Sequence, residues 1–386
     1  MYYSIEINNF KSIKNASIEL PSFGAVVGKN AAGKTNLIQA IQFVRDLAKG
    51  KTATDAQKAI SLIPHELFNF NDGKNEFEIK IILNLKDEKK YLFCVKVSLI
   101  NGSTKPASLF VVEEKLYEIK ENGEKEVVYS RDKNILKDKS DGTIPVVVDI
   151  NKLALALYKT QATDLVRDVF IKTVIPNIEQ INNRESIALG STESEYDNLA
   201  NIIVNLHRNN QKNYDDFQKI IKALLPNFSS VVEIPSKTGE VASPSAEKEN
   251  YLVVLEERNL KQQLSMQSVS SGDLKTLLLI ATAMSMENDS ILIIEEIENG
   301  IHPKRIIELI ERLERISTIK TMQILFTTHS PIVINSLSPQ KIVLTDRGAE
   351  MGTQFTLLSK VEQISEIKKY LQEGGGLTDY LYTSNY

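Results

Sequence analysis

The stretch "GKNAAGKT", residues 28–35, fits the pattern G-x-x-x-x-G-K-[ST] and decides how the rest of the chain is interpreted. It lies between "FGAVVG", which is typical of a short buried strand, and "KTNLIQAIQFVRDLA", whose apolar residues recur at helical spacing. A glycine-rich loop in this context presents backbone N–H groups and the positive end of a helix to an anion. The sequence therefore predicts a P-loop that cradles nucleotide phosphates, with a chance glycine turn as the alternative.

Two side chains of this loop have roles that follow from phosphate chemistry. Lys34 is predicted to offset the charge of the β- and γ-phosphates, and the Thr35 hydroxyl to ligate Mg²⁺. ATP and Mg²⁺ are accordingly the expected ligands. The predicted ATP-binding residues are Gly28, Lys29, Asn30, Ala31, Ala32, Gly33, Lys34, Thr35 and Asn36.

The composition is that of an ordinary globular protein. Of 386 residues, 42% are hydrophobic and 25% are charged, which suits one large domain or two smaller ones. The net charge of -4 gives no general attraction to nucleic acid or anionic membranes. Cys94, the single cysteine, is predicted to be a strand residue in the core. No apolar run is long enough to span a membrane and no signal peptide is evident, so we expect a cytoplasmic location.

The pattern along the chain is mixed α/β, and it changes character in the middle. Alternating segments from "EFEIKIILNL" to "KEVVYS" predict antiparallel hairpins, whereas "ALYKTQATDLVRDVFIKTV", "YDNLANIIVNLHRN" and "YDDFQKIIKALL" predict amphipathic helices. The breaker-rich stretch "PSKTGEVASPSAEKEN" predicts a mobile loop. We therefore expect a P-loop and β lobe in residues 1–150, a helical insertion in 151–228, and a second α/β half in 229–386.

A second informative stretch is "ILIIEEIENGIHP", residues 291–303, in which an apolar strand runs into Glu295 and Glu296. Beside a P-loop, one strand-end carboxylate holds Mg²⁺ and another activates the attacking water, which predicts these roles for Glu295 and Glu296 respectively. His329 follows another apolar strand in "ILFTTHSP" and is predicted to hydrogen-bond the γ-phosphate. The alternative is that these polar residues only mark where buried strands meet water.

The segment "SVSSGDLKTLLLIATAM" places small residues and a glycine at the start of a long apolar helix. Such a start leaves backbone N–H groups available for an anion. By itself it is also explained as a helix cap, with Ser270 or Ser271 as the capping residue.

Together with the opening "IEINNFKSIKNASIEL", these motifs resemble the ABC/SMC-type ATPases of the AAA class that are related to RecF and to the OLD proteins. Within that group the chain is most similar to stand-alone ATPases of bacterial phage-defence systems. The resemblance implies an α/β ABC-type P-loop ATPase head with an antiparallel β lobe and a helical insertion. It also implies that "VSSGD" is a signature motif that contacts a nucleotide held by a second copy, through Ser270, Ser271, Gly272 and Asp273.

Several positions depart from the family or are placed only by it. Ala31 stands where the family often has glycine, at a position that requires an unusual backbone angle. Asn299, Gly300 and His302 follow the acidic pair where the family's D-loop crosses the dimer interface, although His302 is equally explained as a surface residue before a helix. The motifs do not fix the position of the family's glutamine that links the nucleotide to the adjoining lobe, for which Gln161 is a candidate.

The function implied by the resemblance is an ATPase that closes as a homodimer or higher homo-oligomer and controls a neighbour-encoded effector in phage defence. A RecF-like DNA-repair or DNA-clamping ATPase and a slow nucleotide-dependent scaffold are the alternatives. Nucleic acid is a possible partner that nothing specific indicates, and no membrane association is expected. The tail "GGGLTDYLYTSNY" carries Leu377, Tyr380, Leu381, Tyr382 and Tyr386, which either pack on their own head or dock the partner.

Overall fold

In the computed structural model the chain forms two compact units. Unit 1 comprises Met1–Thr173, Asp289–Glu296 and Gln323–Tyr386, and unit 2 comprises Val174–Asn288 and Ile297–Met322. This division differs from the three segments expected from the sequence. The structure describes residues 1–61, 63–69, 73–85, 88–100, 107–138, 148–177, 187–188, 198–236, 250–258, 260, 262–373 and 375–379.

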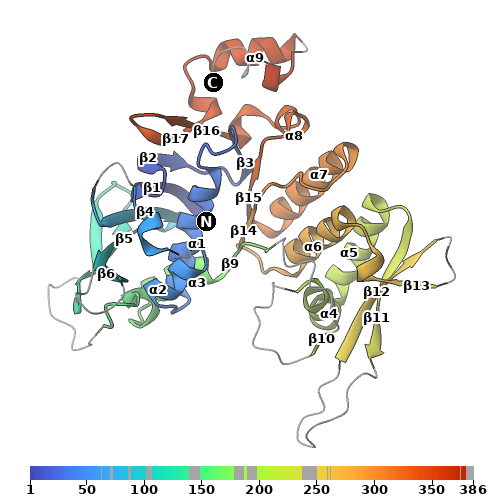
Figure 1. Cartoon of the computed structure of the whole chain (residues 1–386), viewed down its shortest axis with the longest axis horizontal. Coiled ribbons are helices and arrows are strands. Elements are labelled where there is room, and N and C mark those ends of the chain that lie inside the picture. Colours follow the sequence, from blue (N-terminus) through green and yellow to red (C-terminus); the bar gives the residue numbers. More distant parts are fainter. Residues whose placement is uncertain are drawn as a thin grey trace, which may run out of the picture. The chain divides into compact units, whose positions relative to one another are not determined.

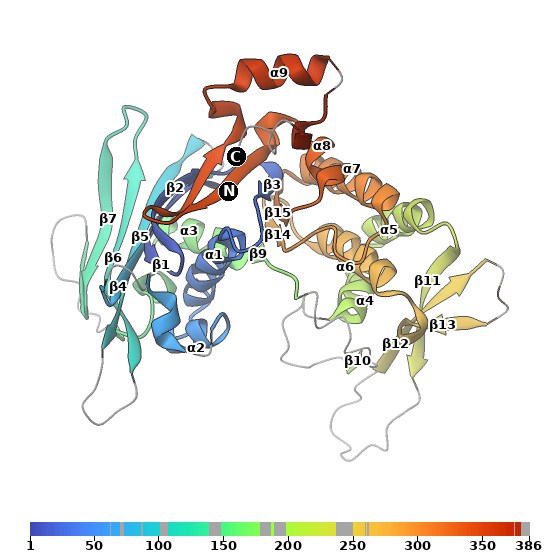
Figure 2. The same ribbon diagram turned by 45° about the horizontal axis from the view of Figure 1, so that its top comes forward.

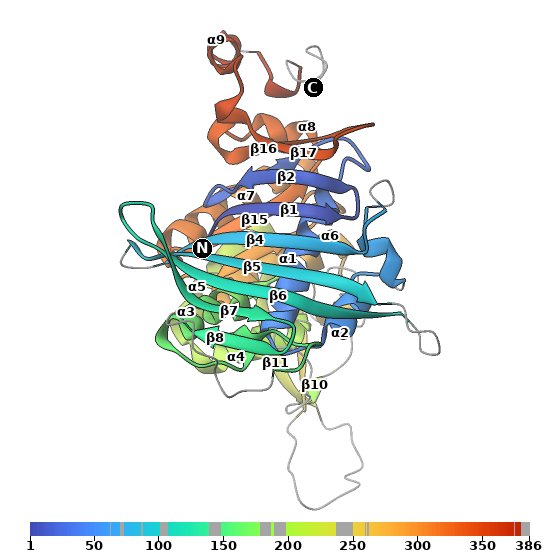
Figure 3. The same ribbon diagram turned by 90° about the vertical axis from the view of Figure 1, so that its left-hand side faces the viewer.

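Unit 1 is built on a 13-stranded sheet in the order β8-β7-β6-β5-β4-β1-β2-β17-β16-β3-β15-β14-β9. The strands β16, β3, β15 and β14 are parallel neighbours, and β1 with β4 to β8 forms an antiparallel lobe, as predicted (Figure 3). The bounds are β1 (Tyr2–Phe10), β2 (Ile13–Glu19), β3 (Phe23–Val27), β4 (Glu76–Asn84), β5 (Lys90–Ile100), β6 (Ser108–Ile119), β7 (Lys125–Asp132), β8 (Ile135–Asp138), β9 (Thr173–Val174), β14 (Ile291–Ile294), β15 (Gln323–Thr328), β16 (Ile342–Gly348) and β17 (Gly352–Leu357).

Helices α1, α2 and α3 lie on one face of the antiparallel strands (Figure 2). The ring of Phe43 on α1 packs edge-on against Phe77 of β4 at 5.3 Å, and Phe170 on α3 packs against Phe93 of β5 at 5.6 Å. Burying each such ring contributes roughly 1.5–3 kcal/mol, so these contacts fix the helices on the sheet. The helices of unit 1 are α1 (Lys34–Ala48), α2 (Ala53–Lys58), α3 (Gln161–Ile171), α8 (Pro331–Asn335) and α9 (Ile364–Gln372).

The opposite face of the lobe carries the alternate, partly exposed residues of β4 to β6. Cys94 lies on this face, where it pairs across the sheet with Lys80 and Lys115. It is only half-buried, so its prediction as a core residue is wrong, because the strand alternation turns it away from the helices. Partial burial raises the pKa of the thiol to about 12, which keeps it protonated and unreactive.

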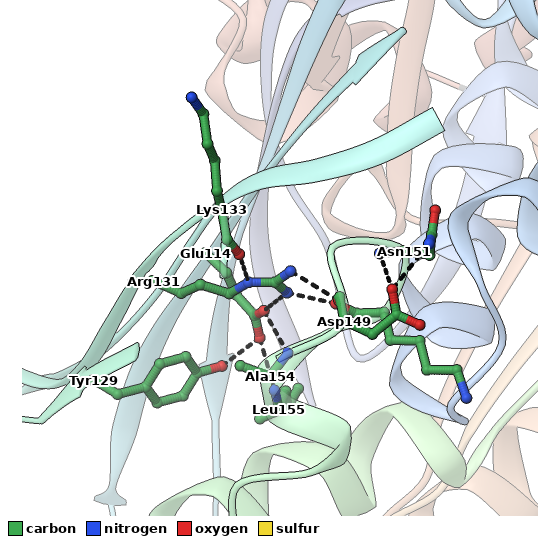
Figure 4. Close-up of polar contacts among 9 residues, drawn as sticks. Glu114, Tyr129, Arg131, Lys133, Asp149, Asn151, Ala154 and Leu155 are labelled. Carbon is green, nitrogen blue, oxygen red and sulfur yellow. Dashed lines mark hydrogen bonds and ion pairs between the residues drawn. The ribbon is translucent and has the colours of Figure 1, made fainter. Parts of the chain in front are cut away.

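A buried ion pair joins the outer strands to the segment that leads into α3. Glu114 and Arg131 have no exposed side-chain surface and lie 3.2 Å apart. The Glu114 carboxylate also accepts from the Tyr129 hydroxyl at 2.6 Å and from the N–H groups of Ala154 and Leu155, while Arg131 donates to carbonyls of the same segment (Figure 4). Removing one partner of such a pair costs about 3–5 kcal/mol, since it leaves an uncompensated buried charge. The pair therefore anchors this segment to β6 and β7.

Within its described residues, unit 2 combines helices α4, α5, α6 and α7 with a small antiparallel sheet in the order β10-β12-β11, to which β13 adds beside β12 (Figure 1). Helix α6 is buried on nearly all sides. At the C-terminal end of α6, the carbonyls of Met284 and Met286 each accept a hydrogen bond of 2.6 Å from Lys320, the last residue of α7. The bounds are α4 (Leu199–Asn209), α5 (Gln211–Leu224), α6 (Ser271–Ser285), α7 (Pro303–Lys320), β10 (Ile187–Ala188), β11 (Phe228–Ser236), β12 (Asn250–Glu257) and β13 (Gln263–Ser265).

The three helices expected between residues 151 and 228 are confirmed as α3, α4 and α5. However, α3 groups with unit 1 through its contact with the sheet, and only α4 and α5 group with unit 2. The loop predicted to be mobile falls largely outside the described residues, at 237–249. Among the helices that the structure describes, none is long and apolar enough to cross a membrane.

Candidate nucleotide site

The P-loop has the backbone geometry that the sequence predicted. Gly33 is the N-cap of α1, with φ of 110°. Because glycine has no side chain, the N-cap residue makes no side-chain hydrogen bond to the first N–H groups of the helix. Ala31 has φ of 63°, in the left-handed region that favours glycine, which agrees with the unusual angle expected at this position. The Lys34 ammonium folds back over the loop and donates to the carbonyls of Gly28 at 2.8 Å and Lys29 at 2.9 Å.

The start of the loop requires a glycine for reasons of space. A Cβ atom on Gly28 would lie 2.3 Å from the Thr345 carbonyl oxygen of β16. Lys29, Asn30, Ala31 and Thr35 are exposed, whereas Ala32, Gly33 and Lys34 are buried. The Asn36 amide donates to the Ser12 hydroxyl at 2.6 Å, so its side chain is bonded within the protein.

Three parallel strands bring the predicted catalytic residues to one edge of the sheet. The last residues of β15 and β3, Thr328 and Val27, pair with each other, so these two strands end level. Strand β14 ends two residues earlier, where Ile294 pairs with Phe326. The residues that follow them leave the sheet at the same edge, namely Glu295 and Glu296 after β14, His329 after β15, and the P-loop after β3. The carboxyl ends of parallel strands are where ligands bind in α/β sheets.

Glu296 has a strained backbone at this edge. Its φ is 43°, and its N–H donates to the Thr327 hydroxyl of β15 at 2.8 Å. A left-handed conformation costs a non-glycine residue about 1–2 kcal/mol, so the neighbouring strand holds Glu296 in an unfavourable geometry. Strain of this kind concentrates at functional sites. The side chain of Glu296 is exposed, as is that of His329, and Glu295 is half-buried.

The residues predicted to hold Mg²⁺ suit that ion. The Thr35 hydroxyl and the Glu295 carboxylate are hard oxygen donors, and Mg²⁺ is commonly bound by one or two carboxylates together with substrate phosphates. No group of three or more His, Cys, Asp or Glu side chains forms a metal cluster within the described ranges. A site that relies on phosphate oxygens does not require such a cluster.

Three of the four predicted signature residues of unit 2, namely Ser270, Gly272 and Asp273, have a structural partner. Ser270 caps α6 by accepting from the Asp273 N–H at 3.2 Å, and the Asp273 carboxylate is ion-paired with Arg305. Gly272 packs directly against Gly300, because a Cβ atom on it would lie 2.0 Å from the Gly300 carbonyl oxygen. Ser271 is the exposed first residue of α6.

The segment after the acidic strand is held against the signature helix. The buried Lys275 ammonium donates to the Asn299 carbonyl at 3.2 Å, and Gly300 has φ of 76°. His302 is the N-cap of α7, where its Nδ1 accepts from the Lys304 N–H at 3.3 Å. This cap explains His302 structurally, as the alternative interpretation held.

Two further predictions have mixed outcomes. Gln161 is the exposed first residue of α3, and its contact with nucleotide stays a prediction. In the tail, Leu377 is 1% exposed and Thr378 donates from its N–H to Asn335 on α8 at 2.8 Å. The described part of the tail therefore packs on its own unit, while residues 380–386 lie outside the described residues.

The sequence analysis missed residues that are far from the P-loop and the acidic pair along the chain but hydrogen-bond to them directly. Thr353 of β17 donates to the Ala32 carbonyl at 2.8 Å, and Thr327 supports Glu296. Ser12, which accepts from Asn36, lies in the opening "NNFKSIKN", where the sequence indicated only a family resemblance. Thr353 gave no signal, because nothing in its local sequence indicates that β17 lies beside the P-loop.

Comparisons with known proteins identify the family. A family model described as "AAA domain, putative AbiEii toxin, Type IV TA system" matches residues 23–335. The chain is 35% identical over 85 residues to the chromosome partition protein Smc of Methanocaldococcus jannaschii, a match that covers 22% of this chain and 7% of that protein. It is 43% identical over 58 residues to the DNA replication and repair protein RecF of Acidothermus cellulolyticus, covering 14% and 16% respectively. These matches span only a small part of the relatives' length.

Among solved structures, the chain is similar to an SMC head bound to the C-terminal winged-helix domain of ScpA. The TM-score is 0.54 with 13% identity, and the superposition covers 92% of this chain and 96% of the other. At this identity the likeness shows the fold, which is that of an ABC-type ATPase head.

Proposed function

Since the chain belongs to the AAA-domain family whose model matches residues 23–335, and is therefore an ATPase, we propose that ATP closes it as a dimer around two nucleotides. The observation that carries the proposal is the common edge of β3, β14 and β15, which gathers the P-loop, the acidic pair and His329. In the dimer, Ser270 and Gly272 of one copy contact the nucleotide on the partner's P-loop.

Each residue has one task in the proposed reaction. Lys34 offsets the charge of the β- and γ-phosphates, and His329 donates a hydrogen bond to a γ-phosphate oxygen. Glu296 accepts a proton from the attacking water as the bond between the γ-phosphorus and the bridging oxygen breaks, which yields ADP and phosphate. Thr35 and Glu295 would hold Mg²⁺, which when bound would neutralise phosphate charge.

A mixing experiment tests whether the site is shared between copies. Ser270→Arg and Lys34→Ala should each abolish hydrolysis, because each destroys both composite sites of a homodimer. A heterodimer of the two retains one intact site, so the mixture should regain about half of the wild-type activity per heterodimer if the sites act independently. Heterodimers verified by differential tags that show no activity would place the site within one chain.

We further propose that the nucleotide state controls a protein partner encoded nearby, in phage defence. Two findings support this role: the family description names a toxin of a type IV toxin–antitoxin system, and the similar SMC head binds a domain of ScpA. The predicted partner should co-purify with the protein from its native operon.

The tail offers a defined truncation for this test. Because Leu377 and Thr378 are buried, a truncation after Asp379 keeps the packed turn, whereas removal of residues 374–386 would uncover α8. Truncation after Asp379 should weaken co-purification and leave hydrolysis intact. Purification of both forms without any partner, together with protection of cells by the ATPase alone, would refute the partner role.

The RecF-like alternative is favoured by the local identity to RecF. It requires a surface that attracts DNA, but the outer face of the lobe pairs its lysines with glutamates. Lys80 lies 2.9 Å from Glu6, and Lys96 lies 3.1 Å from Glu76. Salt-sensitive binding of duplex DNA in a fluorescence anisotropy titration would favour the alternative. A slow scaffold would instead show tight ATP binding with negligible phosphate release.

A further inference from the structure

The hairpin of β16 and β17 contacts the P-loop backbone at consecutive residues. The Thr353 hydroxyl donates to the Ala32 carbonyl at 2.8 Å, and the Arg347 guanidinium lies 3.5 Å from the Ala31 carbonyl as its donor. Arg347 and Thr353 are directly opposite each other in the hairpin. The hairpin lies beyond the residues that the family model matches, and it carries none of the motifs of the nucleotide site.

Thr353 is the last link in a directed chain of hydrogen bonds. Its single hydroxyl proton goes to the Ala32 carbonyl, so in its 2.7 Å contact with Ser12 it must accept. The Ser12 hydroxyl therefore donates to Thr353 and accepts from the Asn36 amide at 2.6 Å. This series of hydrogen bonds runs from Asn36 on α1 to Ser12 in the turn before β2, then to Thr353 on β17 and back to the P-loop. Thr353 is fully buried.

This series of hydrogen bonds determines the direction of the peptide between Ala32 and Gly33 in the P-loop. The Ala32 carbonyl is held toward β17, and no described peptide bond is cis, so the Gly33 N–H of the same planar unit points the opposite way. The fit is close, because a Cβ atom on Gly33 would lie 2.3 Å from the Thr353 hydroxyl oxygen. With Ala31 at φ of 63° and Gly33 at φ of 110°, the loop is not held by regular helix geometry at this point.

We propose that Thr353 is a positioning residue for phosphate binding, which orients the Gly33 N–H through the Ala32 carbonyl. The inference rests on nucleotide binding at the P-loop. Because the hydroxyl bonds only the back of the loop, it touches no phosphate itself. Ser12 and Asn36 act through Thr353 and stabilise the same orientation.

Three variants isolate the hydroxyl. Thr353→Val keeps the shape and removes the donor, Thr353→Ser keeps the donor, and Thr356→Val makes the same change at an exposed position of the same strand. We expect Thr353→Val to weaken ATP and ADP binding about two- to tenfold, the range for one lost hydrogen bond, and to raise KM with little change in kcat. Thr353→Ser and Thr356→Val should bind nearly as the wild type does. Affinity is measured with a fluorescent nucleotide, below the melting transition and with the fraction of binding sites counted.

The outcomes separate this inference from the site assignment. Wild-type affinity in folded Thr353→Val, or equal weakening in Thr353→Ser or Thr356→Val, overturns the positioning role. Lys34→Ala is the reference: if it too binds ATP with unchanged affinity, the P-loop assignment itself fails. If Thr353→Val does not fold, Thr353→Ala takes its place, since it also removes the hydroxyl that donates to Ala32, and unchanged affinity in that variant likewise overturns the role.

Discussion

The P-loop edge and the signature region use polar residues in opposite ways. At the P-loop edge, defined by residues 28–36, Glu295, Glu296 and His329, the backbone is strained and the predicted catalytic side chain of Glu296 is exposed. In the signature region, defined by residues 270–273 and 299–302, most polar side chains cap helices or form ion pairs. The left-handed backbone at Glu296 supports a functional hypothesis for that residue, which experiment must test. A residue whose side chain caps a helix, such as Ser270 or His302, already has a structural role, so only experiment can assign it a second, functional one.

The largest effect on hydrolysis should come from removing the carboxylate of Glu296, whose backbone is strained. Glu296→Gln keeps the size of the side chain but cannot accept a proton, so hydrolysis should fall by roughly two orders of magnitude or more. ATP binding should persist, and a closed dimer should accumulate, as measured by phosphate release and light scattering. Glu308→Gln, at an exposed position of α7, is the control. Wild-type turnover in Glu296→Gln would show that the strained residue at the P-loop edge has no catalytic role, and the contrast with the signature region would then be purely structural.

His329 and His302, one from each region, provide a matched comparison. His329→Ala should lower kcat about ten- to a hundredfold, as expected for a lost hydrogen bond to a charged group. His302→Ala removes a helix cap and should lower the free energy of unfolding by about 1 kcal/mol while kcat stays unchanged. Steady-state kinetics and chemical denaturation of both variants decide the matter. A large loss of kcat in His302→Ala would assign the D-loop a catalytic role beyond its cap.

Gly272 tests the signature region further. In Gly272→Ala the new methyl group meets the Gly300 carbonyl, so the free energy of unfolding should fall by about 1–3 kcal/mol. The control is Gly348→Ala, because nothing lies within 4 Å of a Cβ atom at that position. If Gly272→Ala is as stable as the wild type yet inactive, the glycine serves the nucleotide and not the packing.

The smallest effect concerns strain within the P-loop itself. Ala31→Gly relieves the left-handed conformation but adds freedom to the unfolded chain, so stability should rise by at most about 1 kcal/mol. Ala32→Gly, at a residue without positive φ, should instead lower stability. Thermal denaturation without nucleotide measures both. A stability loss in Ala31→Gly would mean that Ala31 is not strained in solution.

The sequence was sufficient wherever a property depends on neighbours along the chain. The strand, glycine loop and helix around residues 28–35 are contiguous, and α1 covers the predicted segment Lys34–Ala48. The apolar run before Glu295 likewise predicted a buried strand that ends at the acidic pair. The unusual angle at Ala31 was implied by the family resemblance, because the family often has glycine at that position. Such features are encoded by local periodicity and backbone preference.

Tertiary structure alone decided the features that depend on distant segments. The pairing of Glu114 with Arg131, the approach of Gly272 to Gly300, and the contact of Thr353 with Ala32 join residues that no local pattern relates. Each depends on which strands are neighbours and in what register, which is determined only when the whole core packs. For the same reason α3 reads as part of the helical insertion in the sequence, yet its Phe170 places it on the sheet of unit 1.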